Sequence, residues 1–132
     1  MWSDGNFNDL PSIVASDAVF HSPVGLKPYP GRDVVCLVLR TAACVLERFR
    51  YERQLFDGVN AVLEFSAYAD GEELKGVHII RFNGAGEIDD IEKFVRPAKA
   101  AIALGNAIGG RAGEQIREAR DEKARPADTR PL

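Results

Sequence analysis

A histidine among apolar residues stands out first in this sequence. His78 lies at even spacing with Leu74, Ile80 and Phe82 in a run typical of a β-strand, so these side chains share one face. An imidazole has an unperturbed pKa of about 6.5 and can donate or accept a proton near neutrality. Apolar surroundings would lower that pKa and keep the ring neutral, which suits a general base or a hydrogen-bond partner. Alternatively, a backbone carbonyl satisfies one ring nitrogen and His78 only fills space.

Lys93 is the second candidate, because it alternates with Ile91 and Val95 in the last strand-like run. A buried amine could bind a carboxylate or an enolate, or it could form an imine with a carbonyl compound. The alternative is a lysine whose amine reaches the rim of the interior and pairs with Asp90 or Glu92.

His21 and Ser22 are adjacent, which places them on opposite sides of an extended chain. They are therefore not expected to act together as nucleophile and base. A pair of Ser22 with His78 would lack an evident orienting carboxylate, so a hydrolytic pair is not the favoured interpretation. The two histidines lack a surrounding cluster of acids or cysteines, so neither a metal nor another cofactor is expected. Gly84 and Gly86 are interpreted as turn residues, because no helix follows them to complete a phosphate loop.

The size and charge of the chain limit what it can be. A chain of 132 residues suits one domain that buries a core without disulfides or metals. The net charge of -3 comes from intermixed acids and bases, so nothing calls for a nucleic-acid partner. No apolar run approaches the roughly 20 residues that span a bilayer, and residues 1–8 lack the features of a signal peptide. We therefore expect no membrane association and a cytoplasmic location.

Two stretches predict helices ahead of the meander. Residues 9–16 combine apolar residues with an early proline, which predicts a helix of about two turns. After a brief strand at residues 18–20, prolines and glycines predict an irregular loop. Residues 34–49 are apolar almost all round and predict a largely buried helix. Cys36 and Cys44 would lie about 12 Å apart along it, too far for a disulfide, and are expected to be small core residues.

Four runs of β-type residues follow, separated by Asp-Gly and Asn-Gly pairs, a pattern typical of an antiparallel meander. The runs cover residues 50–56, 59–69, 72–82 and 87–96. Apolar and polar side chains alternate in the second run, which predicts one face on a core and the other wetter or at an interface. The apolar set is Leu63, Phe65 and Ala67, and the polar set is Glu64, Ser66 and Tyr68.

The C-terminal part predicts helix after the last strand. An alanine-rich run favours a helix up to Gly109-Gly110, and residues 114–123 favour a second, exposed helix with a solvated charged face. We expect residues 1–100 to form the main domain, residues 101–124 a helical extension and residues 125–132 a flexible tail.

The order of these elements, together with several motifs, resembles the nuclear transport factor 2-like superfamily, and within it the SnoaL-like and ketosteroid-isomerase-like branch. The resemblance covers residues 9–100. It implies an α+β fold in which a cone-shaped, curved antiparallel sheet of about four to six strands packs on a long buried helix around an apolar pocket, as in the cystatin-like roll. The motifs that carry it are Phe20-His21-Ser22-Pro23-Val24, Pro30-Gly31-Arg32, Ala61-Val62-Leu63-Glu64-Phe65, Gly76-Val77-His78-Ile79-Ile80-Arg81-Phe82 with the turn at residues 83–86, and Val95-Arg96-Pro97.

The resemblance also implies roles for particular residues. The loop of that branch carries an aspartate that moves the proton, and this sequence has Ser22 there. A hydroxyl cannot accept a proton at neutral pH without a base beside it, so ketosteroid isomerisation by the usual route is not expected. The branch often carries an acid on the third meander strand, and His78 occupies that position. His78 and Ser22 are therefore the expected catalytic residues, and the residues expected around the ligand are His21, Phe65, Ile80, Phe82, Lys93 and Val95.

The expected function is a small-molecule pocket protein. As an enzyme it would be a cofactor-free isomerase or cyclase that acts by proton transfer on an apolar carbonyl compound, including polycyclic ones. The alternative is a non-catalytic module, either a ligand carrier or a dimerisation domain, with a structural His78. Members of the branch usually dimerise through the outer sheet face, here Glu64, Ser66, Tyr68 and Phe94.

The front of the chain departs from the resemblance, because relatives begin with a long helix that closes the cone. Either Trp2 and Phe7 form a shortened lid, or the start of this sequence lies too far downstream.

Overall fold

Six strands form one curved sheet in residues 9–124, the part of the chain that the computed structural model describes. Their order across the sheet is β2-β1-β6-β5-β4-β3, and within it β1 and β6 run parallel whereas the other neighbours are antiparallel. The strands are β1 Val14–His21, β2 Tyr29–Pro30, β3 Leu46–Asp57, β4 Asn60–Ala69, β5 Glu72–Phe82 and β6 Ile88–Arg96. The predicted four-stranded meander is confirmed as β3 to β6.

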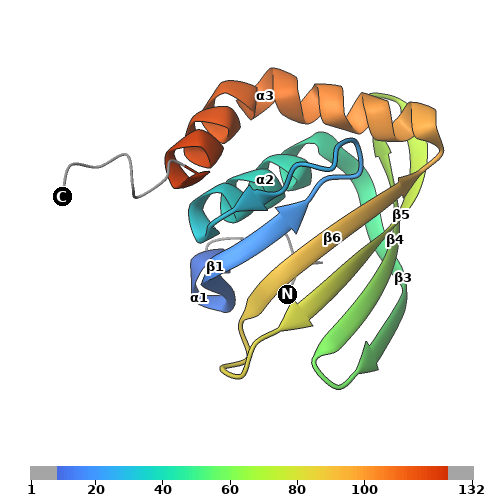
Figure 1. The fold of residues 1–132 in the computed structure, drawn as a ribbon. Helices are drawn as coiled ribbons and strands as arrows, with labels where there is room; N and C mark the ends of the chain where they lie inside the picture. The colour runs from blue at the N-terminus through green and yellow to red at the C-terminus, as the bar shows by residue number, and fades with distance from the viewer. Residues whose placement is uncertain (1–8, 125–132) are drawn as a thin grey trace.

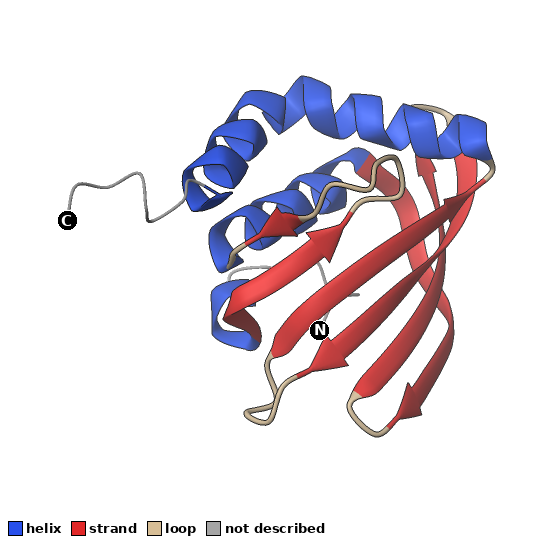
Figure 2. Ribbon diagram, in the orientation of Figure 1, coloured by secondary structure: helices blue, strands red, loops and turns tan. Residues whose placement is uncertain are grey.

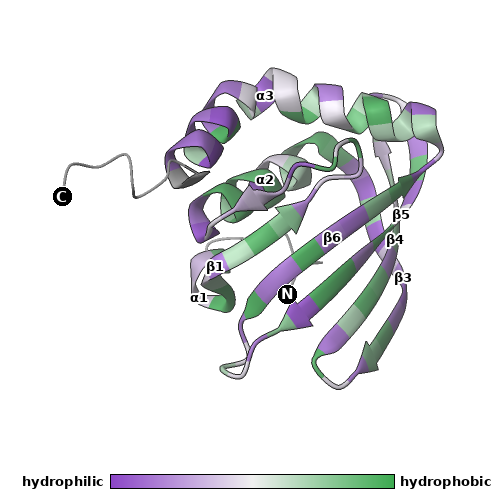
Figure 3. Ribbon diagram, in the orientation of Figure 1, coloured by the Kyte–Doolittle hydropathy of each residue, from purple (hydrophilic) through white to green (hydrophobic). Residues whose placement is uncertain are grey.

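The helices are α1 Leu10–Ile13, α2 Arg32–Val45 and α3 Ala98–Ala124. The sheet curves around α2, and α3 lies across the open end of the sheet and over α2 (Figures 1 and 2). Figure 3 shows that α2 is mostly apolar, whereas the C-terminal end of α3 is hydrophilic. The predicted α+β fold, a curved sheet on a buried helix, is therefore confirmed. None of the helices in residues 9–124 is long and apolar enough to cross a membrane.

The turns of the meander use residues that tolerate unusual backbone angles or bind the backbone. Asp70 and Gly71 connect β4 and β5 with φ angles of 52° and 79°. In the next turn the Asn83 side chain accepts hydrogen bonds from the N–H groups of Ala85 and Glu87, both at 2.9 Å. These turns fix the register of β4, β5 and β6.

The Pro30-Gly31-Arg32 motif fastens the start of α2 to β1. Gly31 has a φ of 105°, which favours glycine, and its N–H donates to the carbonyl of Ala18 at 2.7 Å. The Arg32 Nε donates to the carbonyl of Val14 at 2.8 Å. The motif therefore sets how the buried helix meets the sheet.

The buried helix is shorter than predicted. It ends at Val45, and Leu46 begins β3, although apolar spacing continues as far as Phe49. Pairing with β4 satisfies the backbone of these residues, and this tertiary ladder overrides the local helical pattern. The expectation of two core cysteines is half wrong, because Cys36 is buried and Cys44 is exposed.

Both ends of the described chain also differ from the prediction. The first helix is one short turn that ends at Ile13, because Val14 already pairs with Ile88 in the parallel β1–β6 ladder. The last helix continues through Gly109-Gly110, and its geometry is interrupted instead at Ala112, where φ is -145°. Residues 114–123 are not a wholly solvated helix, because Ile116 is buried in the core.

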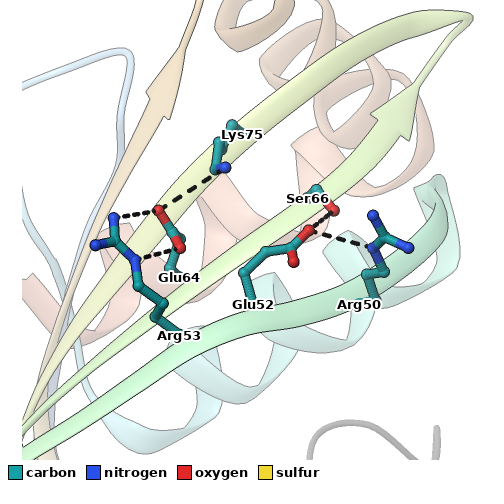
Figure 4. Close-up of polar contacts among 6 residues, drawn as sticks. All are labelled: Arg50, Glu52, Arg53, Glu64, Ser66 and Lys75. Carbon is teal, nitrogen blue, oxygen red and sulfur yellow. Dashed lines mark hydrogen bonds and ion pairs between the residues drawn. The ribbon is translucent and has the colours of Figure 1, made fainter.

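The convex face of the sheet carries a network of charged groups (Figure 4). Arg53 donates to both oxygens of Glu64 at 2.8 and 2.9 Å, and these hydrogen bonds lower the pKa of Glu64 to about 2. Beside this pair, Glu52 accepts hydrogen bonds from Ser66 at 2.8 Å and from Arg50 at 3.2 Å. The prediction that Glu64 and Ser66 share the outer, wetter face is thereby confirmed.

Candidate functional site

Lys93 places an amine inside the cone. Its side chain projects from β6 into the interior and is only 3% exposed. Its Nζ atom lies 5.6 Å from the centroid of the Phe65 ring, and no carboxylate among residues 9–124 lies within ion-pair distance of it. Burial lowers the pKa of Lys93 from 10.5 to about 8. The alternative of a rim lysine paired with Asp90 or Glu92 is therefore wrong.

His78 lies directly opposite Lys93, on the neighbouring strand β5. It is buried, and its ring stacks on that of Phe65 with centroids 4.9 Å apart. Burial, and secondly the charge of Lys93, hold the pKa of His78 well below its usual value of 6.5. The predicted apolar surroundings are thus confirmed, and the ring is neutral at neutral pH.

The ring of Phe65 packs against both groups, and it has room to do so because Gly76 of β5 lies opposite it in the β4–β5 ladder. A Cβ atom at Gly76 would lie 2.5 Å from the Phe65 Cζ and 2.6 Å from the carbonyl oxygen of Phe94. Phe65 also stacks on Phe49 with a centroid distance of 5.1 Å. The inner face of the sheet therefore carries a packed aromatic layer next to Lys93 and His78.

A cavity of about 130 Å³ lies between β6, the loop after β1 and the middle of α3. Lys93 is the one charged side chain of its lining within the described residues. The cavity is close in size to an engineered cavity of about 150 Å³ that holds benzene, and it is smaller than the roughly 300 Å³ at which drug-sized pockets begin. The lining consists of Phe20, Ser22, Pro23, Val24, Tyr29, Val38, Lys93, Leu104, Gly105, Ile108, Gly109, Gly113 and Ile116.

The structure separates His21 from Ser22, as their adjacent positions predict. Ser22 lines the cavity, and its Oγ accepts a hydrogen bond from the Val24 N–H at 3.1 Å. The hydroxyl proton of Ser22 therefore remains available for a ligand oxygen. His21 instead forms a hydrogen bond between its Nε2 and the Asp90 Oδ1 at 2.9 Å and does not line this cavity.

The other predicted site residues lie in the core of the protein and do not line the cavity. Ile80 is buried in one apolar cluster with Phe82 half-buried against it, and Phe65 is buried in a second cluster with Val95 half-buried against it. His78 also lies outside the lining. Of the predicted site residues, the structure brings Ser22 and Lys93 together at this cavity.

Comparison with known proteins places this fold in a family, although no protein-family model and no curated protein matches the chain. A nuclear transport factor 2-like protein of Mesorhizobium loti, 22% identical, covers 73% of this chain and 82% of that chain with a TM-score of 0.66, which shows the fold alone. A protein with a cystatin-like fold from Silicibacter pomeroyi is 31% identical and covers 94% of this chain and 88% of that chain, with a TM-score of 0.84. A steroid delta-isomerase from Pseudomonas aeruginosa is 42% identical and covers 88% of this chain and 86% of that chain, with a TM-score of 0.82. The chain belongs to the nuclear transport factor 2-like superfamily.

This nuclear transport factor 2-like protein uses its last helix in the site, which the sequence-based prediction missed. Gly105 and Gly109 lie four residues apart on one face of α3, Gly113 follows directly after the interruption at Ala112, and all three line the cavity. A Cβ atom added at Gly109 or Gly113 would meet no atom within 4 Å. This glycine face is the signal in the sequence that could have revealed the helix as a wall of the cavity.

A second contact attaches α3 to the opposite wall of the cavity. The Arg120 guanidinium lies over the ring of Tyr29, 4.6 Å from its centroid, and Tyr29 lines the cavity from β2. Trp2 and Phe7, the predicted lid of this nuclear transport factor 2-like protein, lie outside the described residues. Within residues 9–124 no group of three or more His, Cys, Asp or Glu residues could hold a metal ion.

Proposed function

We propose that this protein binds a small apolar compound with a carbonyl oxygen and acts on it by cofactor-free proton transfer. The observation that carries the proposal is the buried side chain of Lys93, a residue that lines an otherwise largely apolar cavity and whose amine has no acid within ion-pair distance in the described chain. An ammonium that has lost its hydration is stabilised by an oxygen that carries or develops negative charge. An enolate oxygen meets this requirement, and the Ser22 hydroxyl offers it a second hydrogen bond.

The volume of the cavity supports a ligand of about one ring. Its 130 Å³ suits a compound near the size of benzene. The Pseudomonas aeruginosa relative is named a steroid delta-isomerase, and that name supports an isomerisation by proton transfer. A cavity of this size favours a compact monocyclic or short aliphatic carbonyl compound over a polycyclic one.

The role proposed for His78 is to exchange a proton with the ligand through Lys93. The ring is neutral at neutral pH and can accept a proton, but it lies outside the lining, directly across the β5–β6 ladder from Lys93. With a pKa of about 8, Lys93 is uncharged in about one molecule in ten at pH 7, so its free amine can take up a proton and its ammonium can give one back. Ser22 would hold the ligand oxygen meanwhile.

Exchange of the α-hydrogens of a small ketone tests the proposal. Cyclohexanone is incubated with the protein in D₂O, and the loss of its α-proton signal is followed by NMR. We expect wild-type protein to accelerate exchange, and we expect the acceleration by Lys93→Met to be at least about tenfold smaller, because the variant lacks one interaction with the transition state. Lys99→Met is the matched control, because Lys99 is exposed and pairs with Glu72. If the wild-type protein exchanges the α-protons of cyclohexanone no faster than Lys93→Met does, the proposed reaction is refuted.

A second candidate function is ligand binding without catalysis, favoured by the burial of His78 against Phe65 and its absence from the lining. His78→Ala separates the two. If the protein is an enzyme, His78→Ala binds cyclohexanone but no longer exchanges its α-protons. If the protein only binds its ligand, His78→Ala is less stable and binds cyclohexanone with unchanged affinity.

We also propose that the protein forms a homodimer through the convex face of the sheet. Ile79 and Phe94 are exposed there by 38% and 48%, although both are large apolar side chains. The charged side chains of Glu64 and Lys75 lie together on the same face of the sheet (Figure 4). An apolar centre with a charged rim is the usual arrangement of an interface between proteins.

A further inference from the structure

We infer that Lys93 forms a covalent imine with the carbonyl carbon of a small aldehyde or ketone held in the cavity. This inference rests on the proposed function, because it needs the same cavity and the same class of ligand, and it adds a covalent step to the same site.

The position of the Lys93 amine meets the requirements for a nucleophile. A lysine attacks a carbonyl carbon when its amine faces the bound compound, loses its proton readily and is not held in an ion pair. Lys93 lines the cavity, is only 3% exposed and has no acid within ion-pair distance among residues 9–124. Burial also lowers its pKa to about 8, which increases the fraction of free amine.

Lys75 and Lys99 lack this combination. Lys75 is half exposed, and its Nζ lies 3.9 Å from the Glu64 carboxylate. Lys99 is 79% exposed, and its Nζ lies 3.4 Å from the Glu72 carboxylate. Neither lines the cavity, so both serve as internal references for unspecific reaction with an aldehyde.

The step balances without any further reactant. The Lys93 ammonium first gives one proton to solvent water, and the lone pair of the free amine attacks the carbonyl carbon. A C–N bond forms as the C=O π bond breaks, and the carbonyl oxygen takes up a proton from the attacking nitrogen. The first proton then returns to the oxygen of this carbinolamine, its C–O bond breaks, water leaves and a C=N bond forms. Overall, the ammonium and the aldehyde give a protonated imine and water, so the positive charge is conserved.

The cavity suits each species along this route. The protonated imine stays a cation near the face of the Phe65 ring, where the amine lies 5.6 Å from the centroid. The Ser22 hydroxyl, whose oxygen accepts the Val24 N–H, can donate its proton to the carbinolamine oxygen. The rest of the lining is largely apolar, so a compact aromatic or aliphatic group fits beside the carbonyl.

Reductive trapping tests the inference on the full chain. The protein is incubated with benzaldehyde and sodium cyanoborohydride, and benzylated lysines are located by peptide mass spectrometry. We expect Lys93 to be benzylated at least tenfold faster than Lys75 and Lys99. In Lys93→Met no lysine should be benzylated at this fast rate, whereas in Lys99→Met the fast benzylation of Lys93 should remain. The map of the wild-type protein is decisive even if Lys93→Met does not fold.

Binding of benzyl alcohol, which has no carbonyl group, distinguishes failure of the imine step from failure of the proposed function. Binding is followed by NMR in wild-type protein. If benzyl alcohol binds and the lysines are benzylated at similar rates, the imine is overturned and the proposed small-molecule site stands. If neither benzyl alcohol binds nor Lys93 reacts preferentially, both are overturned. Preferential benzylation of Lys93 supports the imine.

Discussion

The amine of Lys93 destabilises the folded chain, and this cost points to a role in binding or chemistry. A buried ammonium loses its hydration, and no acid of the described chain offsets that loss. A methionine of similar length would fill the same space without this penalty. The charge is therefore better explained by a ligand than by the stability of the fold.

The cost of this charge predicts how stability depends on pH. Lys93 has a pKa of about 8 in the folded chain and about 10.4 when unfolded, so between these values the unfolded chain binds more protons and stability rises with pH. Loss of the Lys93 proton over this pH range raises the free energy of unfolding by about 3 kcal/mol. At pH 7, where this gain is absent, Lys93→Met should therefore be more stable than wild type by a similar amount.

Urea unfolding of both proteins at pH 7 and pH 10 measures this difference. The comparison with Lys93→Met is needed because burial raises the pKa values of Cys36 and Tyr51, which lowers stability at high pH in both proteins. An equal stability difference at the two pH values would contradict the prediction.

Gly76 is the second residue on which the site depends. We expect Gly76→Ala to destabilise the chain by roughly 2–4 kcal/mol, because its Cβ would overlap the Phe65 ring and the backbone oxygen of Phe94. Thermal unfolding measures the loss. Gly84→Ala is the matched control, since a Cβ there meets no atom within 4 Å. Similar unfolding temperatures for the two variants would show that the aromatic layer is not tightly packed.

At the scale of elements, α3 decides the shape of the cavity. Its glycine face lies over the space beside Lys93, and the contact of Arg120 with Tyr29 holds its second part against β2. Glycine in a helix interior costs about 1 kcal/mol relative to alanine. The missing side chains at Gly105, Gly109 and Gly113 leave room at the wall of the cavity.

Filling this room should separate binding from stability. Gly109→Ala adds a methyl group at the wall of the cavity, and we expect it to stabilise the helix by about 0.4–1 kcal/mol while weakening benzyl alcohol binding. Gly110→Ala is the control, because Gly110 is exposed like Gly109 but does not line the cavity, so it should stabilise without loss of binding. Calorimetric titration and thermal unfolding of both variants provide the measurements. Equal affinities would exclude the glycine face as a wall of the ligand site.

At the scale of the whole molecule, the convex sheet face exposes two large apolar side chains, Ile79 and Phe94. We expect the wild-type chain to sediment as a dimer at micromolar concentration and Phe94→Glu to sediment as a monomer, because a charge would be buried in the apolar centre of the interface. Phe56→Glu is the control, since Phe56 is 70% exposed at the tip of the β3–β4 hairpin. A monomeric wild-type chain would rule out this interface at that concentration.

The sequence alone determined the meander and the inward direction of its apolar residues. Turn pairs such as Asp70-Gly71 bend the chain locally, and the two-residue period of a strand then assigns every side chain between them to a face. The buried position of His78 followed from this period. The family resemblance likewise came from motifs confined to short stretches, and it was confirmed.

Only the tertiary structure decided which polar group faces the cavity. His78 and Lys93 lie on the same inner face, and the strand period cannot tell which of them is covered by Phe65 and which is left beside α3. The place of α3 depends on packing between residues far apart in the sequence, such as Arg120 and Tyr29, which no local pattern records. For the same reason the end of α2 at Val45 was set by strand pairing and not by its apolar spacing.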